Sequence, residues 1–109
     1  MSTKLPKNVA AYVEAYNARN PEAAAACFSE DALVHDEGKD HRGRKAIGDW
    51  IGETIQKYQP LLSPGKVEGS DRNPEVAVTV SGSFPGSPVT LRFQFTMEND
   101  RIAELNIVP

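Results

Sequence analysis

The sequence has little cysteine, no long hydrophobic run and no excess of charge of one sign. Its single cysteine, Cys27, excludes an internal disulfide framework and is typical of the reducing cytoplasm. No apolar run approaches the roughly 20 residues of a membrane-spanning helix, and none follows Lys4 as a secretory signal peptide would require. The 12 Lys and Arg residues against 15 Asp and Glu, a net charge of −3, lack the basic excess of nucleic-acid-binding proteins. We therefore expect a cytoplasmic protein that binds neither membranes nor nucleic acids.

The length of 109 residues suits one domain, which we assign to residues 1–109. Hydrophobic residues make up 39% of the chain, so a core of ordinary composition can be buried. A chain of this size buries a smaller share of its surface than a larger one, so dimerisation would help it. Helical patterns fill the first half and strand patterns the second, which predicts an α+β fold rather than alternating βαβ units.

Three helices are predicted before residue 60. The first begins near Pro6 and ends at Asn20, because a residue before proline avoids the helical region. A second, short helix begins at Pro21, and a third runs from Gly43 to Pro60. Hydrophobic residues at helical spacing mark the buried faces of the first and third helices: Val9, Tyr12, Val13 and Tyr16, and Ile47, Trp50, Ile51, Ile55 and Tyr58.

The other segments predict strands joined by turns. Apolar and polar residues alternate most clearly over residues 75–84 and 89–96, with a last strand over 101–108 and a weaker candidate around Val67. Before the third helix, residues 29–31 are predicted to form a turn, residues 32–36 a short strand and residues 37–42 a polar loop.

Asp36 is the first candidate for chemistry. If Ala32 and Val34 face the core, the period of two along a strand places Asp36 on that face and His35 on the other. A carboxylate among apolar side chains has its charged form disfavoured, which suits a general base. The alternative is a solvated aspartate at a strand end, the commoner environment of this residue type.

Tyr12 and Tyr16 are the second candidates, because a phenol on a buried helix face can donate a hydrogen bond to a ligand oxygen. Their alternative is packing in the core with the hydroxyl at its rim. His35, Asp36, Asp40 and His41 contain ligand types for zinc or iron, but their spacing fits no metal-binding motif, so we predict no metal and no cofactor.

The whole chain resembles the nuclear transport factor 2-like superfamily, and within it the SnoaL-like and ketosteroid isomerase-like proteins. The resemblance is carried by residues 12–22, by residues 27–36 and by the segment from Arg42 to Trp50 that enters the third helix. It implies a cone, in which a curved antiparallel sheet wraps around three N-terminal helices and leaves a pocket at the open end. It also implies a homodimer that packs the outer faces of its sheets together.

Two functional positions of ketosteroid isomerases match this chain residue by residue. Their tyrosine on the first helix aligns with Tyr12 and their base aspartate with Asp36, without a gap between the two. Their second acid, on a late strand, aligns with Leu91, which cannot donate to an enolate. The loss of such a donor costs on the order of 3–4 kcal/mol, so steroid isomerisation itself is not expected. The expected lining of the pocket is Tyr16, Val34, Trp50, Phe84, Leu91 and Phe93.

Three functions stay open at this point. In the first, Asp36 moves a proton on a small apolar or aromatic carbonyl compound whose oxygen Tyr12 polarises, as an isomerase, cyclase or dehydratase would require. In the second, the same pocket binds such a ligand without turnover. In the third, the protein is an adaptor that uses its sheet for partners.

Overall fold

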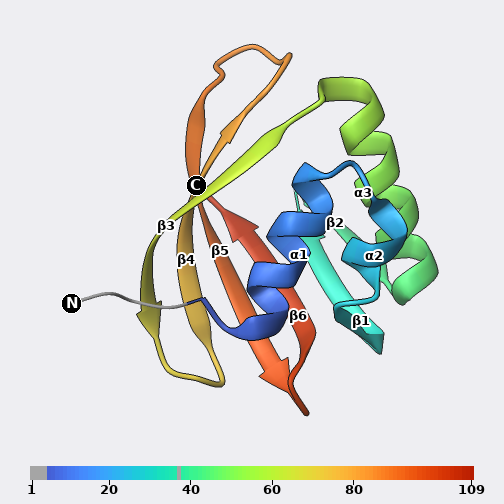
Figure 1. The fold of residues 1–109 in the computed structure, drawn as a ribbon, viewed down its shortest axis with the longest axis vertical. Coiled ribbons are helices and arrows are strands. Elements are labelled where there is room, and N and C mark those ends of the chain that lie inside the picture. Colours follow the sequence, from blue (N-terminus) through green and yellow to red (C-terminus); the bar gives the residue numbers. More distant parts are fainter. Residues whose placement is uncertain (1–4, 37) are drawn as a thin grey trace.

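The structure, a computed structural model, describes residues 5–36 and 38–109. Three helices lie against one face of a curved six-stranded sheet that wraps around them without closing (Figure 1). The helices are α1 (Lys7–Asn17), α2 (Pro21–Ala25) and α3 (Arg44–Tyr58). The strands are β1 (Phe28–Asp36), β2 (Lys39–Arg42), β3 (Leu61–Gly69), β4 (Pro74–Ser81), β5 (Val89–Glu98) and β6 (Arg101–Val108), in the order β2-β1-β6-β5-β4-β3. No helix among the described residues is both long and apolar enough to cross a membrane.

All three predicted helices are confirmed, and their ends have identifiable causes. The side chain of Asn20 accepts a hydrogen bond from the Ala23 amide and so caps α2, while Pro21 occupies the first turn. Helix α3 begins after Gly43, whose φ of 89° favours glycine. It ends at Gln59 in the left-handed conformation, directly before Pro60.

The predicted turn at residues 29–31 is wrong, because this segment belongs to β1. Its pairing with β6 is irregular, since Phe28 lies opposite Ile102 and Leu33 already opposite Glu104. Arginine side chains satisfy carbonyls in this irregular stretch: Arg44 donates to Phe28 at 2.8 Å. The polar residues were mistaken for a turn because these long-range donors leave no local signal.

The predicted polar loop at residues 37–42 is also wrong for residues 39–42, while Glu37 lies outside the described residues. Residues 39–42 form β2, an edge strand that pairs antiparallel with β1 and places His41 opposite Val34. Gly38, with a φ of 74°, lies in the connection. The strand is short and carries polar residues on both faces, so its period of two could not be recognised.

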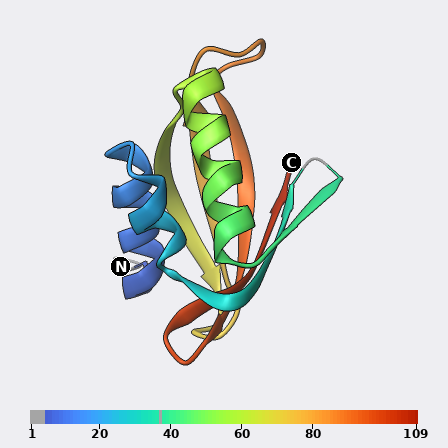
Figure 2. The same ribbon diagram turned by 90° about the vertical axis from the view of Figure 1, so that its right-hand side faces the viewer.

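The sheet is mixed rather than purely antiparallel, because β1 and β6 pair in parallel. This pair joins the helical half of the chain to the antiparallel meander β3–β6 (Figure 1). Seen from the side, α3 runs along the sheet, and the C-terminus lies near the tip of the β1–β2 hairpin (Figure 2). The weak candidate around Val67 is part of the longer edge strand β3, whose register shifts between Pro64 and Val67.

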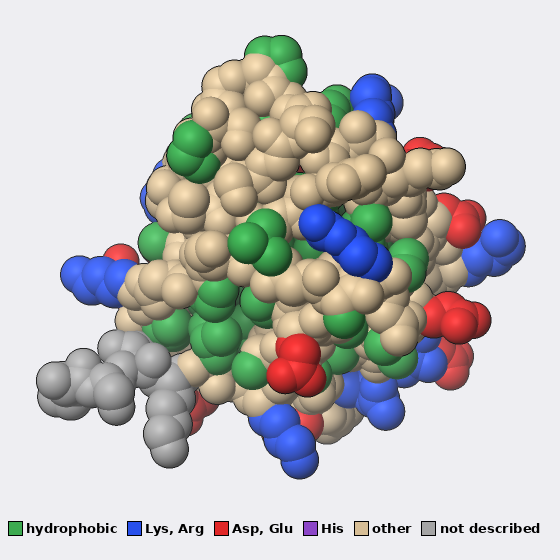
Figure 3. Space-filling view, turned by 45° about the horizontal axis from the view of Figure 1, so that its top comes forward, with side chains coloured by type: hydrophobic (Ala, Val, Ile, Leu, Met, Phe, Trp, Pro, Cys, Tyr) green, Lys and Arg blue, Asp and Glu red, His purple; other side chains and the backbone are tan. Residues whose placement is uncertain are grey.

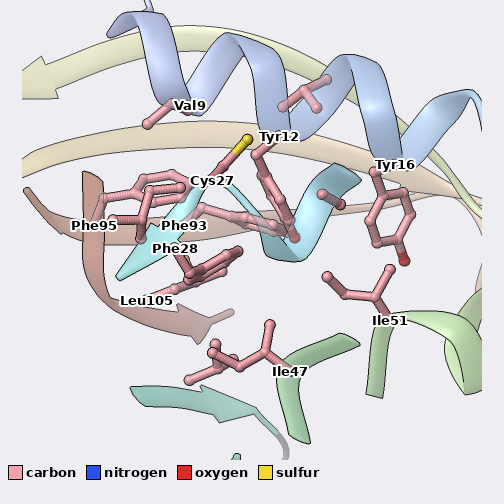
Figure 4. Packing of buried hydrophobic residues seen from close by; sticks show 14 of the residues in the cluster. Val9, Tyr12, Tyr16, Cys27, Phe28, Ile47, Ile51, Phe93, Phe95 and Leu105 are labelled. Atoms are coloured by element: carbon pink, nitrogen blue, oxygen red, sulfur yellow. The ribbon is translucent and has the colours of Figure 1, made fainter. Parts of the chain in front are cut away.

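The core lies between the helices and the inner face of the sheet. Tyr12 is 1% exposed, and its ring meets those of Phe28 and Phe95 edge to face at centroid distances of 5.4 and 6.3 Å (Figure 4). Val34 of β1 and Leu105 of β6 lie side by side in the same core and are both fully buried. The inner face of the sheet is therefore apolar at its base.

A close approach of backbone fixes the corner where α3 meets the end of β4. A Cβ atom at Gly82 would lie 2.7 Å from the Tyr58 carbonyl oxygen and 3.0 Å from the Pro60 Cα. The amide of Ser83 donates to the same Tyr58 carbonyl at 2.7 Å. Only a residue without a side chain fits between the two segments at this distance.

We predict that Gly82→Ala lowers the free energy of unfolding by about 1–3 kcal/mol, because the added methyl group must push two backbone segments apart. Ser83→Ala is the matched control, since Ser83 is exposed and its contact with Tyr58 uses only the backbone. We expect it to stay within about 0.5 kcal/mol of the wild type. Urea unfolding of the three proteins measures both values, and equal midpoints would contradict the assigned role of Gly82.

Candidate active site

Asp36 is the last residue of β1 and faces the helices. It follows Val34 by two positions, and Val34 is fully buried on the inner face. The parallel register places His35 beside Asn106, and Asp36 follows His35 toward the end of β6, where Ile107 lies opposite Phe93. Asp36 is itself half-buried. It therefore lies on the inner face one row beyond the fully buried base.

Tyr12 and Tyr16 extend from one face of α1, and both phenol oxygens point toward the side where Ile47 and Ile51 of α3 lie (Figure 4). Burial raises the pKa of Tyr12 well above its ordinary value near 10, and Tyr16 and Asp36 raise it further. Burial also raises the pKa of Tyr16, with Arg19 opposing this and Asp36 adding to it. Asp36 is thus within electrostatic reach of both phenols, which remain protonated donors.

Trp50 and His41 form a stacked pair beside this group. Their ring centroids are 5.2 Å apart and their planes are inclined by 23°. Trp50 is half-buried and packs against the core from α3, rather than fully buried. The sequence names His41 only among residues of metal-ligating type, and its position on the inner face beside Trp50 depends on β2, which the sequence does not predict.

The remaining candidates lie at different depths. Phe93 is 3% exposed and part of the core, whereas Leu91, two residues earlier on β5, is half-buried opposite Val78. Phe84 packs edge to face on Tyr58 at 5.8 Å, in the connection between β4 and β5. It thus belongs to the corner where α3 ends.

Apolar side chains surround the polar groups of the inner face. Partly exposed hydrophobic side chains of α3 and of the sheet pack against the core, among them Trp50, Ile55, Val80, Leu91 and Ile107. At the end of the molecule that carries the β4–β5 connection, hydrophobic side chains are exposed in small patches and most charged ones lie toward the rim (Figure 3). A small, largely apolar ligand fits these surroundings better than a highly charged one.

The outer face of the sheet is polar and hydrogen-bonded. His35 lies between Asp40, at 2.6 Å, and Glu104, at 3.1 Å. The two histidines of the hairpin therefore lie on opposite faces.

Among the described residues, no three side chains of metal-ligating type lie close enough together to hold a metal ion.

Two surface grooves lie away from Asp36 and the tyrosines. One, of about 450 Å³, is on the outer face of the sheet and includes Glu75, Gln94 and Asn106. The other, of about 770 Å³, separates α2 from α3 and includes Arg44 and Gln56. Neither groove is lined by the inner-face group, so we do not assign the ligand to them.

The profile of the SnoaL-like domain family matches residues 9–105. Among solved structures, a candidate polyketide cyclase from Sinorhizobium meliloti is 37% identical, with a TM-score of 0.90 and 94% of each chain covered. A comparison with curated proteins gives no match.

More distant structures share the fold. A protein with a ketosteroid isomerase-like fold from Catenulispora acidiphila is 18% identical, with a TM-score of 0.85 over 97% of this chain and 87% of that one. The epoxide hydrolase/cyclase-like enzyme of pyran ring formation in salinomycin is 21% identical, with a TM-score of 0.81 over 94% and 87%. The α+β fold predicted from the sequence is therefore confirmed as nuclear transport factor 2-like.

The raised pKa values of Tyr12 and Tyr16 predict a loss of stability in alkali. Below the ordinary value near 10, both phenols are protonated in the folded and the unfolded chain. Above it, the unfolded chain releases protons that the folded chain still holds, so unfolding becomes more favourable as the pH rises.

We expect Tyr12→Phe/Tyr16→Phe to lose less unfolding free energy than the wild type between about pH 9 and about pH 11.5. Deprotonation of other groups is common to both proteins and cancels in the comparison. Urea titrations across this pH range provide the measurement, and parallel curves would show that the two phenols do not contribute.

Proposed function

The chain belongs to the SnoaL-like family, and we propose that it binds a small, largely apolar carbonyl compound and removes a proton from it with Asp36. The observation that carries this proposal is a half-buried carboxylate on the apolar inner face, within electrostatic reach of two buried phenols. A base and hydrogen-bond donors around one apolar space are the elements that enolisation needs. The candidate polyketide cyclase among the relatives is consistent with this class of reaction.

In the proposed step, Asp36 takes the proton from the carbon next to the carbonyl group, and the electron pair moves to the oxygen. A phenol of Tyr12 or Tyr16 donates a hydrogen bond to that oxygen, because its raised pKa keeps it protonated. The apolar neighbours keep water away and strengthen this bond. The resulting enolate can take a proton at another carbon or attack a second carbonyl group, which gives isomerisation or ring closure.

Leu91 limits the class of substrates that the proposed site can deprotonate. A second acid at this position would stabilise the enolate by about 3–4 kcal/mol, and leucine offers no donor. We therefore propose substrates whose α-proton is already acidic, such as compounds with two carbonyl groups or an aryl ring beside that carbon, rather than simple ketones.

The test uses 2-tetralone, a small aromatic ketone with acidic α-protons. We expect the protein to accelerate exchange of these protons for deuterium in D₂O, followed by NMR, and Asp36→Asn to lower that rate about a hundredfold or more. The amide keeps the shape of the side chain without its basicity, so the affinity measured by Trp50 fluorescence should change little. Asp40→Asn is the matched control, because Asp40 lies on the outer face of the same hairpin.

The same experiment separates the other functions. Binding of 2-tetralone without accelerated exchange would replace the enzyme by a non-catalytic binding protein. If 2-tetralone neither binds nor exchanges its protons faster, the result favours the third function, an adaptor whose sheet contacts partner proteins.

We also propose that the chain acts as a homodimer through the outer face of β5, around Thr90, Arg92, Gln94 and Thr96. Side chains on this face are polar and already fixed by hydrogen bonds: Gln94 donates to Glu75 at 2.7 Å, and Asn106 donates to Gln94 at 3.1 Å. A preorganised polar face can pair with its own copy across a two-fold axis.

Light scattering at micromolar concentration should give the mass of a dimer for the wild type and of a monomer for Gln94→Lys, which places two like charges near the axis. Gln56→Lys, with the same change of charge on the exposed face of α3, should remain dimeric. A monomeric wild type would refute the proposed interface.

A further inference from the structure

The β1–β2 hairpin carries one histidine and one aspartate on each of its faces. On the outer face, His35 and Asp40 are directly opposite and in contact at 2.6 Å. On the inner face, Asp36 lies opposite Lys39 and His41 opposite Val34, so Asp36 and His41 are diagonal neighbours. Diagonal side chains of an antiparallel pair are about 7–8 Å apart between their Cα atoms and somewhat less between their Cβ atoms.

Side chains of α3 and β1 hold the imidazole of His41 at this position. Trp50 of α3 stacks on it at 5.2 Å, and Val34 opposite it is fully buried. The charged groups facing it on the hairpin are Asp36 and Lys39, while Lys45 and Asp49 of α3 are exposed and pair with each other at 3.5 Å. The ring is thus fixed beside Asp36 without being enclosed, since His41 is half-buried.

A substrate bound against the inner face of the hairpin would contact both the base, Asp36, and a second group that can carry a proton, His41. Side chains at diagonal positions of one face can reach two neighbouring carbon atoms of one small molecule, one losing a proton and the other losing its oxygen. Proton transfer to a leaving oxygen by a positioned imidazolium is a common role of histidine in enzymes.

We propose that His41 is the general acid that works with Asp36, and that the site eliminates water from β-hydroxy carbonyl compounds. This inference rests on the proposed function, because it requires Asp36 to act as the base. Asp36 takes the α-proton, the electron pair forms the carbon–carbon double bond, and the bond from the β-carbon to oxygen breaks. His41 donates its proton to the departing oxygen, so that water leaves and an α,β-unsaturated carbonyl compound remains. Proton transfer from Asp36 to His41, through solvent, restores both groups.

Two probes with the same carbon skeleton isolate the role of His41. The first is 4-hydroxy-3-phenylbutan-2-one, whose α-carbon carries the aryl ring and whose hydroxyl group must be protonated in order to leave. The second is its acetate ester, whose acetate group leaves without a proton. Both lose the same α-proton and give the same unsaturated ketone, which is followed by its ultraviolet absorbance.

We expect His41→Gln to slow elimination from the hydroxy ketone about a hundredfold and elimination from the acetate less than about threefold. Asp36→Asn should slow both, because both need the base. His35→Gln is the matched control on the outer face of the same hairpin and should change neither rate. His41→Phe keeps an aromatic ring against Trp50 without a transferable proton, and it should reproduce the selective loss if the glutamine variant folds poorly.

The outcomes separate the two proposals. If Asp36→Asn slows both probes while the His41 variants slow both equally or neither, the general acid is refuted and the proposed base stands. If wild type and Asp36→Asn do not differ on either probe, the base is refuted, and the inference about His41 falls with it. A loss confined to the hydroxy ketone in both His41 variants supports the proposal, because a merely structural role would affect the two probes alike.

Discussion

The ring of Tyr12 holds the two halves of the molecule together. It is enclosed by the rings of Tyr16, Phe28 and Phe95, which come from α1 itself, from the start of β1 and from the middle of β5. Edge-to-face contacts of this kind restrict the angle and the distance between the helix and the sheet. The position of α1 on the sheet, and with it the distance of both phenols from Asp36, therefore depends on this aromatic cluster.

The same cluster also forms the most deeply buried level of the candidate site. Side chains at its base are fully buried and leave no room for water, whereas Trp50, Leu91 and Ile107 at the next level are only partly covered. Asp36 and His41 lie at this next level and are half-buried, whereas Tyr12 and Tyr16 belong to the buried base. The pKa values of Tyr12 and Tyr16 are raised mainly because their phenol groups are buried, which is the largest contribution to each shift.

Helices and the well-patterned strands could be predicted from the sequence, because their hydrophobic residues recur with the period of each element. Asp36 could be placed on the inner face for the same reason, since Val34 fixes the phase of β1. The strand at residues 29–31 could not be predicted, because the carbonyls of Phe28 and Asp31 in this stretch accept hydrogen bonds from Arg44 and Arg42, which lie 16 and 11 positions further along the chain. The parallel pairing of β1 with β6 left no local trace either, and without β2 the inward direction of His41 could not be recognised.

The β1–β2 hairpin, of which the sequence predicts only the first strand, places its two histidines in different surroundings. Its outer histidine is engaged by two carboxylates, Asp40 and Glu104, which are fixed by the register of the sheet. Its inner histidine meets an indole ring, which offers stacking but accepts no proton. The hairpin thus places two chemically identical residues in different surroundings, and the difference comes only from the face to which each side chain points. Leu91 offers no hydrogen-bond donor on β5, so in our proposal the second proton-transferring group comes from the edge strand β2, as His41.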